Sequence, residues 1–314
     1  MPIHDLGYRG WNGQRSSEAT RWWVITGTGI RLAWKMRLLQ RFVLLAWLPA
    51  VYMGVAFFLY EQSAIHPEMR QQAIGFFRNM AGQQGMAFVQ ATDLVDPAEA
   101  RHQIWGWLLL TFFRHPQGVL MALVVGLIAP PLISQDVRSR AFLLYFSRPI
   151  TRAEYVLGKL AVVCAYVSFI TTAPALALYV FGVLLSPDLS VLQYTWDLPL
   201  RIVAASLLLM VPTTTLALAF SSLSTRSYYA GFAWFAFWAG GFITYSFLQG
   251  TLPGRFDDRW ALLSRHHTLG RVQSWVFDLG VTFSSVLPFL LVLVGLSALS
   301  VGTVFWRVAA CTRG

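Results

Sequence analysis

Six long apolar stretches constrain what this 314-residue chain can fold into more than any other feature of its sequence. A helix needs about 20 predominantly apolar residues to cross the hydrocarbon core of a bilayer. Stretches of this kind cover residues 42–60, 117–134, 157–185, 198–223, 229–250 and 281–305. Their only basic residues, Lys159 and Arg201, stand near an end, and no Asp or Glu stands at mid-depth. We therefore predict an all-α, polytopic membrane protein with a six-helix transmembrane bundle.

The composition agrees with a membrane protein. Apolar residues make up 56% of the chain and charged residues 12%, whereas soluble domains are about a quarter charged. A soluble fold of this length could not bury so much apolar surface, and a bilayer removes the need to do so. Prolines inside the stretches predict kinked spans whose freed carbonyls are bonded by neighbouring helices: Pro49, Pro130, Pro131, Pro174, Pro212 and Pro288.

The distribution of charge predicts the orientation. With the N-terminus in the cytoplasm, the inner segments 1–41, 135–159, 224–228 and 306–314 carry 15 basic and four acidic residues, and the rest of the chain carries nine basic and ten acidic ones. Basic residues concentrate on the cytoplasmic side of membrane proteins. We expect both termini in the cytoplasm, and we read the net charge of +10 as topology and contact with the lipid bilayer, not as nucleic-acid binding.

This orientation divides the chain into three parts. Residues 1–41 form a cytoplasmic tail and, over 21–41, an interfacial helix rich in Trp and basic residues, or simply the flanking charge of a span. Residues 42–305 form the transmembrane domain, with outer loops at about 61–116, 186–197 and 251–280 and an inner loop at about 135–159. Residues 306–314 form a second cytoplasmic tail.

Two outer segments have local features of their own. Asp96, Pro97 and Glu99 are typical of a helix start, and the apolar stretch 104–113 that follows is too short to span a bilayer. We expect short re-entrant or interfacial helices on the outer side. The segment 251–280 is polar, and we expect it to face water.

The inner loop reads as a sharp corner between two helices. Pro149 disfavours helix at Arg148, and a new helix is predicted to start at Thr151, which forms a capping box with Glu154. Ile150 and Tyr155 have the spacing of a hydrophobic staple. A rigid, cationic, aromatic corner suits docking of a cytosolic partner, while a simple helical hairpin is the alternative.

The same loop carries a resemblance to a known family. The runs DVRSRA at 136–141 and LYFSRPITRAEYVLGK at 144–159 resemble the first cytoplasmic loop of type-2 ABC exporter permeases, and LALAFSSLSTRSYYAG at 216–231 is similar to the end of their fourth span and the turn after it. The chain departs from the family pattern at Arg140, where many relatives have Gly, and in its long first outer loop.

The resemblance implies the membrane-spanning permease subunit of an ATP-driven exporter in the plasma membrane, the inner membrane of a bacterium. It implies a separate ABC-type ATPase subunit, which would hold ATP and Mg, and a second permease copy in a homodimer or heterodimer. Closure of the ATPase would push the inner loop and tilt the bundles. The coupling residues would be Asp136, Arg138, Arg148, Pro149, Thr151, Arg152, Glu154 and Tyr155.

Other functions lack their sequence signatures. No phosphate-binding loop of the type Gly-x-x-x-x-Gly-Lys-Ser/Thr is present, so we predict no ATP chemistry, no catalytic residues and no cofactor in this chain. No hydrolase motif or intramembrane acidic relay is present either. Five of the six histidines fall on the outer side without ligand spacing, and we predict no metal site. The remaining alternatives are a membrane anchor or assembly scaffold that transports nothing and a membrane-embedded enzyme.

Side chains inside the spans add two expectations. Thr213, Thr214 and Thr215 follow Pro212 and either line a pathway or bond backbone carbonyls in helix packing. The aromatic-rich fifth span is expected to face lipid or a second copy.

Overall fold

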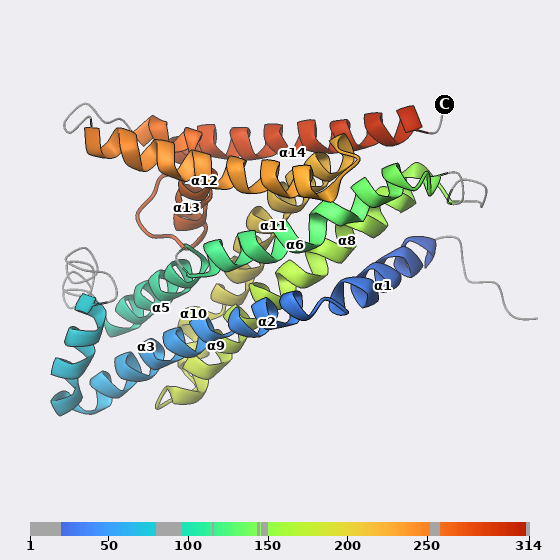
Figure 1. Ribbon diagram of the computed structural model, residues 1–314. Coiled ribbons are helices and arrows are strands. Elements are labelled where there is room, and N and C mark those ends of the chain that lie inside the picture. The colour runs from blue at the N-terminus through green and yellow to red at the C-terminus, as the bar shows by residue number, and fades with distance from the viewer. Residues whose placement is uncertain are drawn as a thin grey trace, which may run out of the picture.

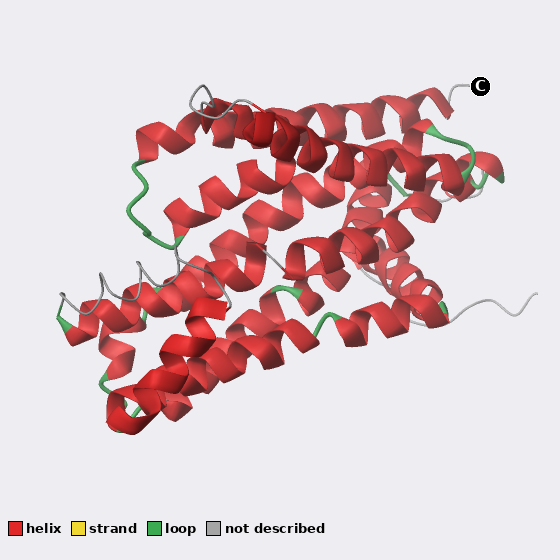
Figure 2. Cartoon of the chain, turned by 60° about the vertical axis from the view of Figure 1, so that its left-hand side comes forward, coloured by secondary structure: helices red, strands yellow, loops and turns green. Residues whose placement is uncertain are grey.

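The computed structural model describes residues 20–79, 96–114, 116–142, 145, 150–251 and 258–311. These residues form helices and loops and no strand (Figure 2). The elements are α1 (Arg21–Trp34), α2 (Arg37–Leu45), α3 (Leu48–Ile65), η2 (Pro67–Met69), α5 (Pro97–Arg114), α6 (Pro116–Arg138), α8 (Arg152–Ile170), α9 (Thr172–Leu185), α10 (Val191–Thr195), α11 (Leu198–Leu223), α12 (Ser227–Thr251), η3 (Asp258–Leu263), α13 (Arg265–Val276) and α14 (Phe283–Cys311).

Six segments of this structure are long and apolar enough to cross a membrane: Arg37–Ser63, Ala98–Arg138, Arg152–Leu185, Val191–Leu223, Ser227–Thr251 and Phe283–Ala310. They confirm the predicted all-α bundle of six spans. Short breaks among the described residues interrupt three of them: at Ala46 and Trp47 before Pro49 in the first, at Thr171 before Pro174 in the third, and at Trp196 and Asp197 before Pro199 in the fourth. Prolines at these breaks fit the second or third residue of the following helix, where a missing N–H is tolerated.

The helices are arranged around α11. It packs against α14 and α6 and also touches α8, α9, α12 and α13. Figure 1 shows α12 and α14 on one side of the bundle, α1, α2 and α3 on the other, and α6, α8 and α11 between them. We call the end of the bundle at which α6 ends and α8 begins the corner end; the end of α14 and the start of α1 lie there too.

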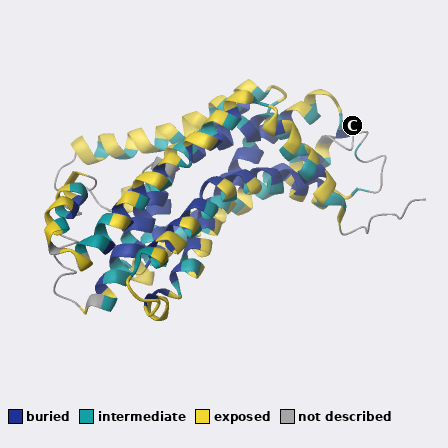
Figure 3. Ribbon diagram, turned by 90° about the horizontal axis from the view of Figure 1, so that it is seen from below, coloured by how far each residue is buried: buried dark blue, intermediate teal, exposed yellow. Residues whose placement is uncertain are grey.

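The outer faces of the bundle are apolar, as a membrane requires. Buried side chains follow the inside, and exposed ones, many of them large and apolar, cover the outside (Figure 3). Span α12 buries only Ala230 and Trp234, while Tyr228, Phe232 and Phe247 are exposed. This agrees with the expectation that the fifth span faces lipid or a second copy, with Trp234 as the exception.

Helix α5 holds the segment 104–113, for which we expect a re-entrant or interfacial position. In the structure this segment is enclosed by protein: Trp105, Leu109 and Phe112 have no exposed surface. The Nε1–H of Trp105 donates to Glu61 at 3.0 Å, and Arg101 pairs with the same carboxylate at 3.2 Å. The buried acid therefore anchors α5 to α3.

Helix α13 differs from the prediction that 251–280 faces water. Its residues Arg265, Thr268 and Gln273 are buried, and it packs against α14, α11, α12 and α5. Two of these side chains find hydrogen-bond partners inside, since the Thr268 hydroxyl donates to the carbonyl of Ala261 at 2.8 Å and Gln273 Nε2 donates to that of Ala205 at 3.5 Å. A polar sequence therefore does not require exposure when the bundle supplies the hydrogen bonds.

Helix α1 lies directly on α8. The Tyr166 hydroxyl donates to the carbonyl of Ile30 at 2.9 Å, and Thr26 donates to that of Gly158 at 3.2 Å. Two glycines permit this approach: a Cβ on Gly29 would lie 2.5 Å from Val162 Cγ2, and one on Gly158 would lie 2.8 Å from Ile25 Cβ. Small residues allow backbones to come close in membrane helix pairs.

We expect Gly29→Leu to separate α1 from α8 and to destabilise the folded chain by about 1–3 kcal/mol, the usual cost of overpacking. Gly27→Leu is the matched control, because a Cβ on Gly27 meets nothing within 4 Å. Unfolding of the two detergent-purified variants measures the difference. Equal stability of the two would contradict the tight α1–α8 contact.

Candidate functional site

The corner between α6 and α8 begins where α6 ends. Arg140 has φ 53°, and the amides of Arg140 and Ala141 donate to the carbonyls of Val137 at 3.5 Å and Asp136 at 3.0 Å. This pair of bonds with a left-handed residue is a Schellman motif, which terminates helices. Glycine is favoured at the left-handed position. Arg140, which stands where many relatives have Gly, therefore occupies a strained backbone conformation.

Helix α8 starts with the predicted capping box. The Glu154 amide donates to the Thr151 hydroxyl at 3.2 Å, and the Thr151 amide donates to the Glu154 carboxylate at 2.6 Å. Both side chains therefore satisfy backbone N–H groups that the first turn leaves without partners. The start of α8, and with it the exit of the corner, is fixed by local chemistry.

A buried ion pair braces the corner from inside. Lys159 Nζ lies 2.7 Å from Asp136 Oδ2, and the Tyr155 hydroxyl donates to the same oxygen at 2.7 Å. The side chains of Lys159 and Asp136 are only 10% and 15% exposed. The ammonium also lies 5.9 and 5.5 Å from the ring centres of Tyr145 and Tyr155. These contacts tie the last turn of α6 to the first turns of α8.

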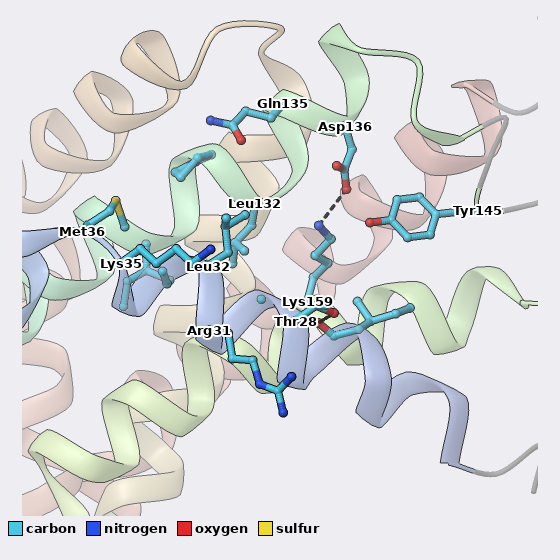
Figure 4. A pocket seen from close by; sticks show the side chains of 15 residues that line it. Thr28, Arg31, Leu32, Lys35, Met36, Leu132, Gln135, Asp136, Tyr145 and Lys159 are labelled. Carbon is cyan, nitrogen blue, oxygen red and sulfur yellow. Dashed lines mark hydrogen bonds and ion pairs between the residues drawn. The ribbon is translucent and has the colours of Figure 1, made fainter. Parts of the chain in front are cut away.

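A cavity of about 610 Å³ opens beside this ion pair, between α1, α6 and α8. Figure 4 shows Lys159 reaching Asp136, with Tyr145 next to them and Lys35 and Gln135 at the other side of the cavity. Burial and the nearby Asp136 charge raise the pKa of the Tyr145 phenol, so its hydroxyl stays protonated at neutral pH. Arg31 of α1 and Lys35, which follows α1, add positive charge to the lining.

The predicted coupling residues fall into three groups. Tyr155 is buried and Asp136 nearly so, so both position the corner from inside. Arg138, Thr151 and Arg152 are exposed at its surface, where Glu154 is half-buried. Arg148 and Pro149 lie outside the described residues.

Ser221 of α11 holds α6 at its proline pair. Its hydroxyl oxygen accepts from the amides of Ile133 and Ser134, both at 3.1 Å, and its O–H donates to the carbonyl of Pro130 at 2.7 Å. Pro130 and Pro131 have no N–H for the carbonyls one turn earlier in α6, and the Ser221 hydroxyl ties α6 to the neighbouring helix beside this weakened turn. We did not single out Ser221 from the sequence, although it lies within the second matching run.

A family model described as ABC-2 family transporter protein matches residues 32–307, from the end of α1 almost to the end of α14. The chain belongs to the ABC-2 transporter permease family. It is a multi-pass membrane protein and the membrane permease subunit of an ABC transporter. No curated protein matches the chain.

The three threonines of the permease after Pro212 bond carbonyls of their own helix. Thr213 donates to Leu209, Thr214 to Val211 at 3.3 Å, and Thr215 to Val211 at 2.8 Å. All three are buried, and Thr213 also accepts a hydrogen bond from Arg265. No group of three or more metal-ligating side chains comes together among the described residues of the permease.

Proposed function

We propose that this permease is the membrane half of an ATP-driven exporter and that a separate ABC-type ATPase docks on its α6–α8 corner. ATP and Mg would bind to that ATPase, and this chain would supply the translocation path. The observation that carries the proposal is the braced corner: Asp136, Lys159 and Tyr155 are locked together inside it, while Arg138 and Arg152 lie exposed at its surface.

Such a corner can transmit a displacement into the bundle. A push on it moves α6 and α8 together, because the 2.7 Å ion pair joins them. Helix α8 carries α1 through the contacts at Gly158 and Tyr166. Helix α6 carries α11 through Ser221 and α12 through the 3.0 Å contact of Ser134 with Ser227.

The proposal includes an orientation and a second copy. The corner end would be cytoplasmic, because the basic residues of the sequence concentrate in segments that lie there. The exposed aromatic face of α12 would pair with the second permease copy or with lipid. Labelling of a Ser139→Cys variant from outside the cell would overturn this orientation.

Reversing the exposed charges at the corner tests the docking. We expect Arg138→Glu/Arg152→Glu to weaken binding of the ATPase subunit at least about tenfold, since like charges across an interface repel and exposed charged groups steer association. Stimulated ATP turnover in the complex should fall with it. Co-purification and ATPase assays in nanodiscs measure both quantities.

Arg78→Glu is the matched control, because Arg78 is exposed and follows α3, at the end of the bundle opposite the corner. It should leave binding and ATP turnover unchanged. The docking proposal fails if the corner variant binds and stimulates the ATPase like the unmodified permease.

A further inference from the structure

Arg265, the first residue of α13, is a buried cation that no acid of the described residues neutralises. The residue is 6% exposed. Its Nη2 group donates to the Thr213 hydroxyl, while its Nε and Nη1 groups have no hydrogen-bond partner in the part of the chain that the structure describes. No carboxylate forms an ion pair with it among the described residues. Burial lowers the pKa of the guanidinium to about 9, so it stays charged at neutral pH.

The position of Arg265 is near the middle of the spans. A Cβ on Gly241 would lie 2.8 Å from the carbonyl oxygen of Leu263 and 3.3 Å from Ser264 Cα, so the start of α13 rests against Gly241 of α12. Gly241 is ten residues from the end of α12 at Thr251, or about 15 Å along the helix. At its other end α13 returns toward the end of the bundle opposite the corner, where Arg201 Nη1 donates to Val276 at 2.7 Å.

The surroundings of the guanidinium are aromatic. Its centre lies 5.6 Å from the ring centre of Trp234 and 5.3 Å from that of Trp238. Cation–π contacts of this kind offset part of the desolvation of a cation and supply no negative charge. The positive end of the α13 dipole adds to the charge of the guanidinium, and the first turn of α13 contains no acid that would offset it.

A cation in this position is costly to keep for stability alone. Burying a charge without a counter-charge is unfavourable, and an apolar side chain of similar size would fill the same space. Ionisable groups at membrane depth are typical of substrate and ion pathways. Helix N-termini that end inside a bundle provide sites for anionic groups by the same electrostatics.

We propose that Arg265, Thr213 and the indoles of Trp234 and Trp238 form a binding site for an oxyanion, a phosphate or carboxylate, carried on an apolar molecule. The oxyanion would accept from the Nε and Nη1 groups, and the indoles would contact the apolar part. The ligand would reach the site when α12 separates from α11. Helix α12 is suited to this motion because it buries only two of its residues in the rest of the chain.

As a statement about the cargo, the proposal rests on the proposed transport function. The same chemistry could come from the phosphate of a resident anionic lipid or from a transported amphiphile. Three probes test the preference of the site for a negative charge. They are decyl phosphate, decanol and decyltrimethylammonium, which share one chain length and differ in charge. Their binding to the full permease in phosphatidylcholine nanodiscs is followed by the shift of the thermal unfolding midpoint with concentration.

We expect decyl phosphate to bind and the neutral and cationic compounds to bind at least tenfold more weakly. Arg265→Gln should weaken decyl phosphate binding at least tenfold, Arg265→Lys should restore part of it, and the exposed-site control Arg78→Gln should leave it unchanged. The site is refuted if Arg265→Gln binds decyl phosphate like the unmodified permease, or if decanol binds as tightly.

The thermal midpoint measured without ligand is a second readout, because a structural role of Arg265 and a binding role predict opposite changes in it. Arg265→Met keeps the packing volume and removes the charge, so its thermal midpoint should equal or exceed that of the unmodified permease. A midpoint several degrees lower would identify Arg265 as a structural cation and overturn the proposal.

Two further measurements separate the sources and the hypotheses. If native mass spectra show phosphatidylglycerol bound to the unmodified permease and absent from Arg265→Gln, the ligand is a resident lipid. If decyl phosphate stimulates ATP turnover, the ligand is cargo. Either result supports the site. If decyl phosphate binding depends on Arg265 but the corner variants leave ATP turnover unchanged, the exporter proposal is refuted and the proposed binding site stands. If the corner variants lower ATP turnover but Arg265→Gln leaves decyl phosphate binding unchanged, the proposed binding site is refuted and the exporter proposal stands.

Discussion

Replacing Asp136 with Ala is expected to destabilise the permease by about 3–5 kcal/mol, because Lys159 would stay buried without its counter-charge. The two groups lie 2.7 Å apart and are almost enclosed. The variant also leaves the Tyr155 hydroxyl without its acceptor, which in the native chain is the same carboxylate oxygen at 2.7 Å. Unfolding of the purified chain in mixed detergent micelles measures the loss.

The double variant Asp136→Leu/Lys159→Met is the decisive comparison. It removes both charges and keeps apolar volume, so most of the lost stability should return. Arg138→Ala, two residues from Asp136 but exposed, should change stability by no more than about 0.5 kcal/mol. If the double variant is as unstable as the single one, the ion pair does not brace the corner.

A second large effect is expected at Ser221. Ser221→Ala should destabilise the permease by about 2–4 kcal/mol, because two buried N–H groups of α6 lose this acceptor together and the Pro130 carbonyl keeps only the Ser134 hydroxyl as a side-chain donor. Those groups belong to Ile133, Ser134 and Pro130.

Ser222→Ala provides the control one residue away. Both serines are completely buried, but the Ser222 hydroxyl bonds only the carbonyl of Ala219 in its own helix, at 2.8 Å. Its removal should change stability by less than about 1 kcal/mol. Similar losses in the two alanine variants would mean that the bond from Ser221 to α6 contributes little.

The sequence predicted the spans and the corner because both depend on local information. Apolar length determines a span, and the capping box between Thr151 and Glu154 uses residues three positions apart. The brace inside the corner was not predicted. Asp136 and Lys159 border two different spans, and their proximity follows only after α6 and α8 are folded against each other.

Positions that depend on non-local contacts were harder to predict. The polar sequence of α13 indicated exposure, yet the helix is buried because α11, α12 and α14 surround it. Ser221 is one of several serines and threonines within spans, and only the three-dimensional structure places it opposite Pro130 and Pro131. Arg265 lies in a segment that was predicted to be a hydrated loop, and an arginine in such a loop does not indicate a buried site.

The left-handed conformation of Arg140 has a consequence for engineering this protein. Its φ of 53° would be relaxed by glycine, at a gain of about 1 kcal/mol. A screen that selects only for heat resistance would therefore favour glycine here and discard a charge from the face that we propose docks the ATPase. Thermostable versions chosen in that way should be checked for nucleotide-driven turnover before they are used as stand-ins for the natural chain.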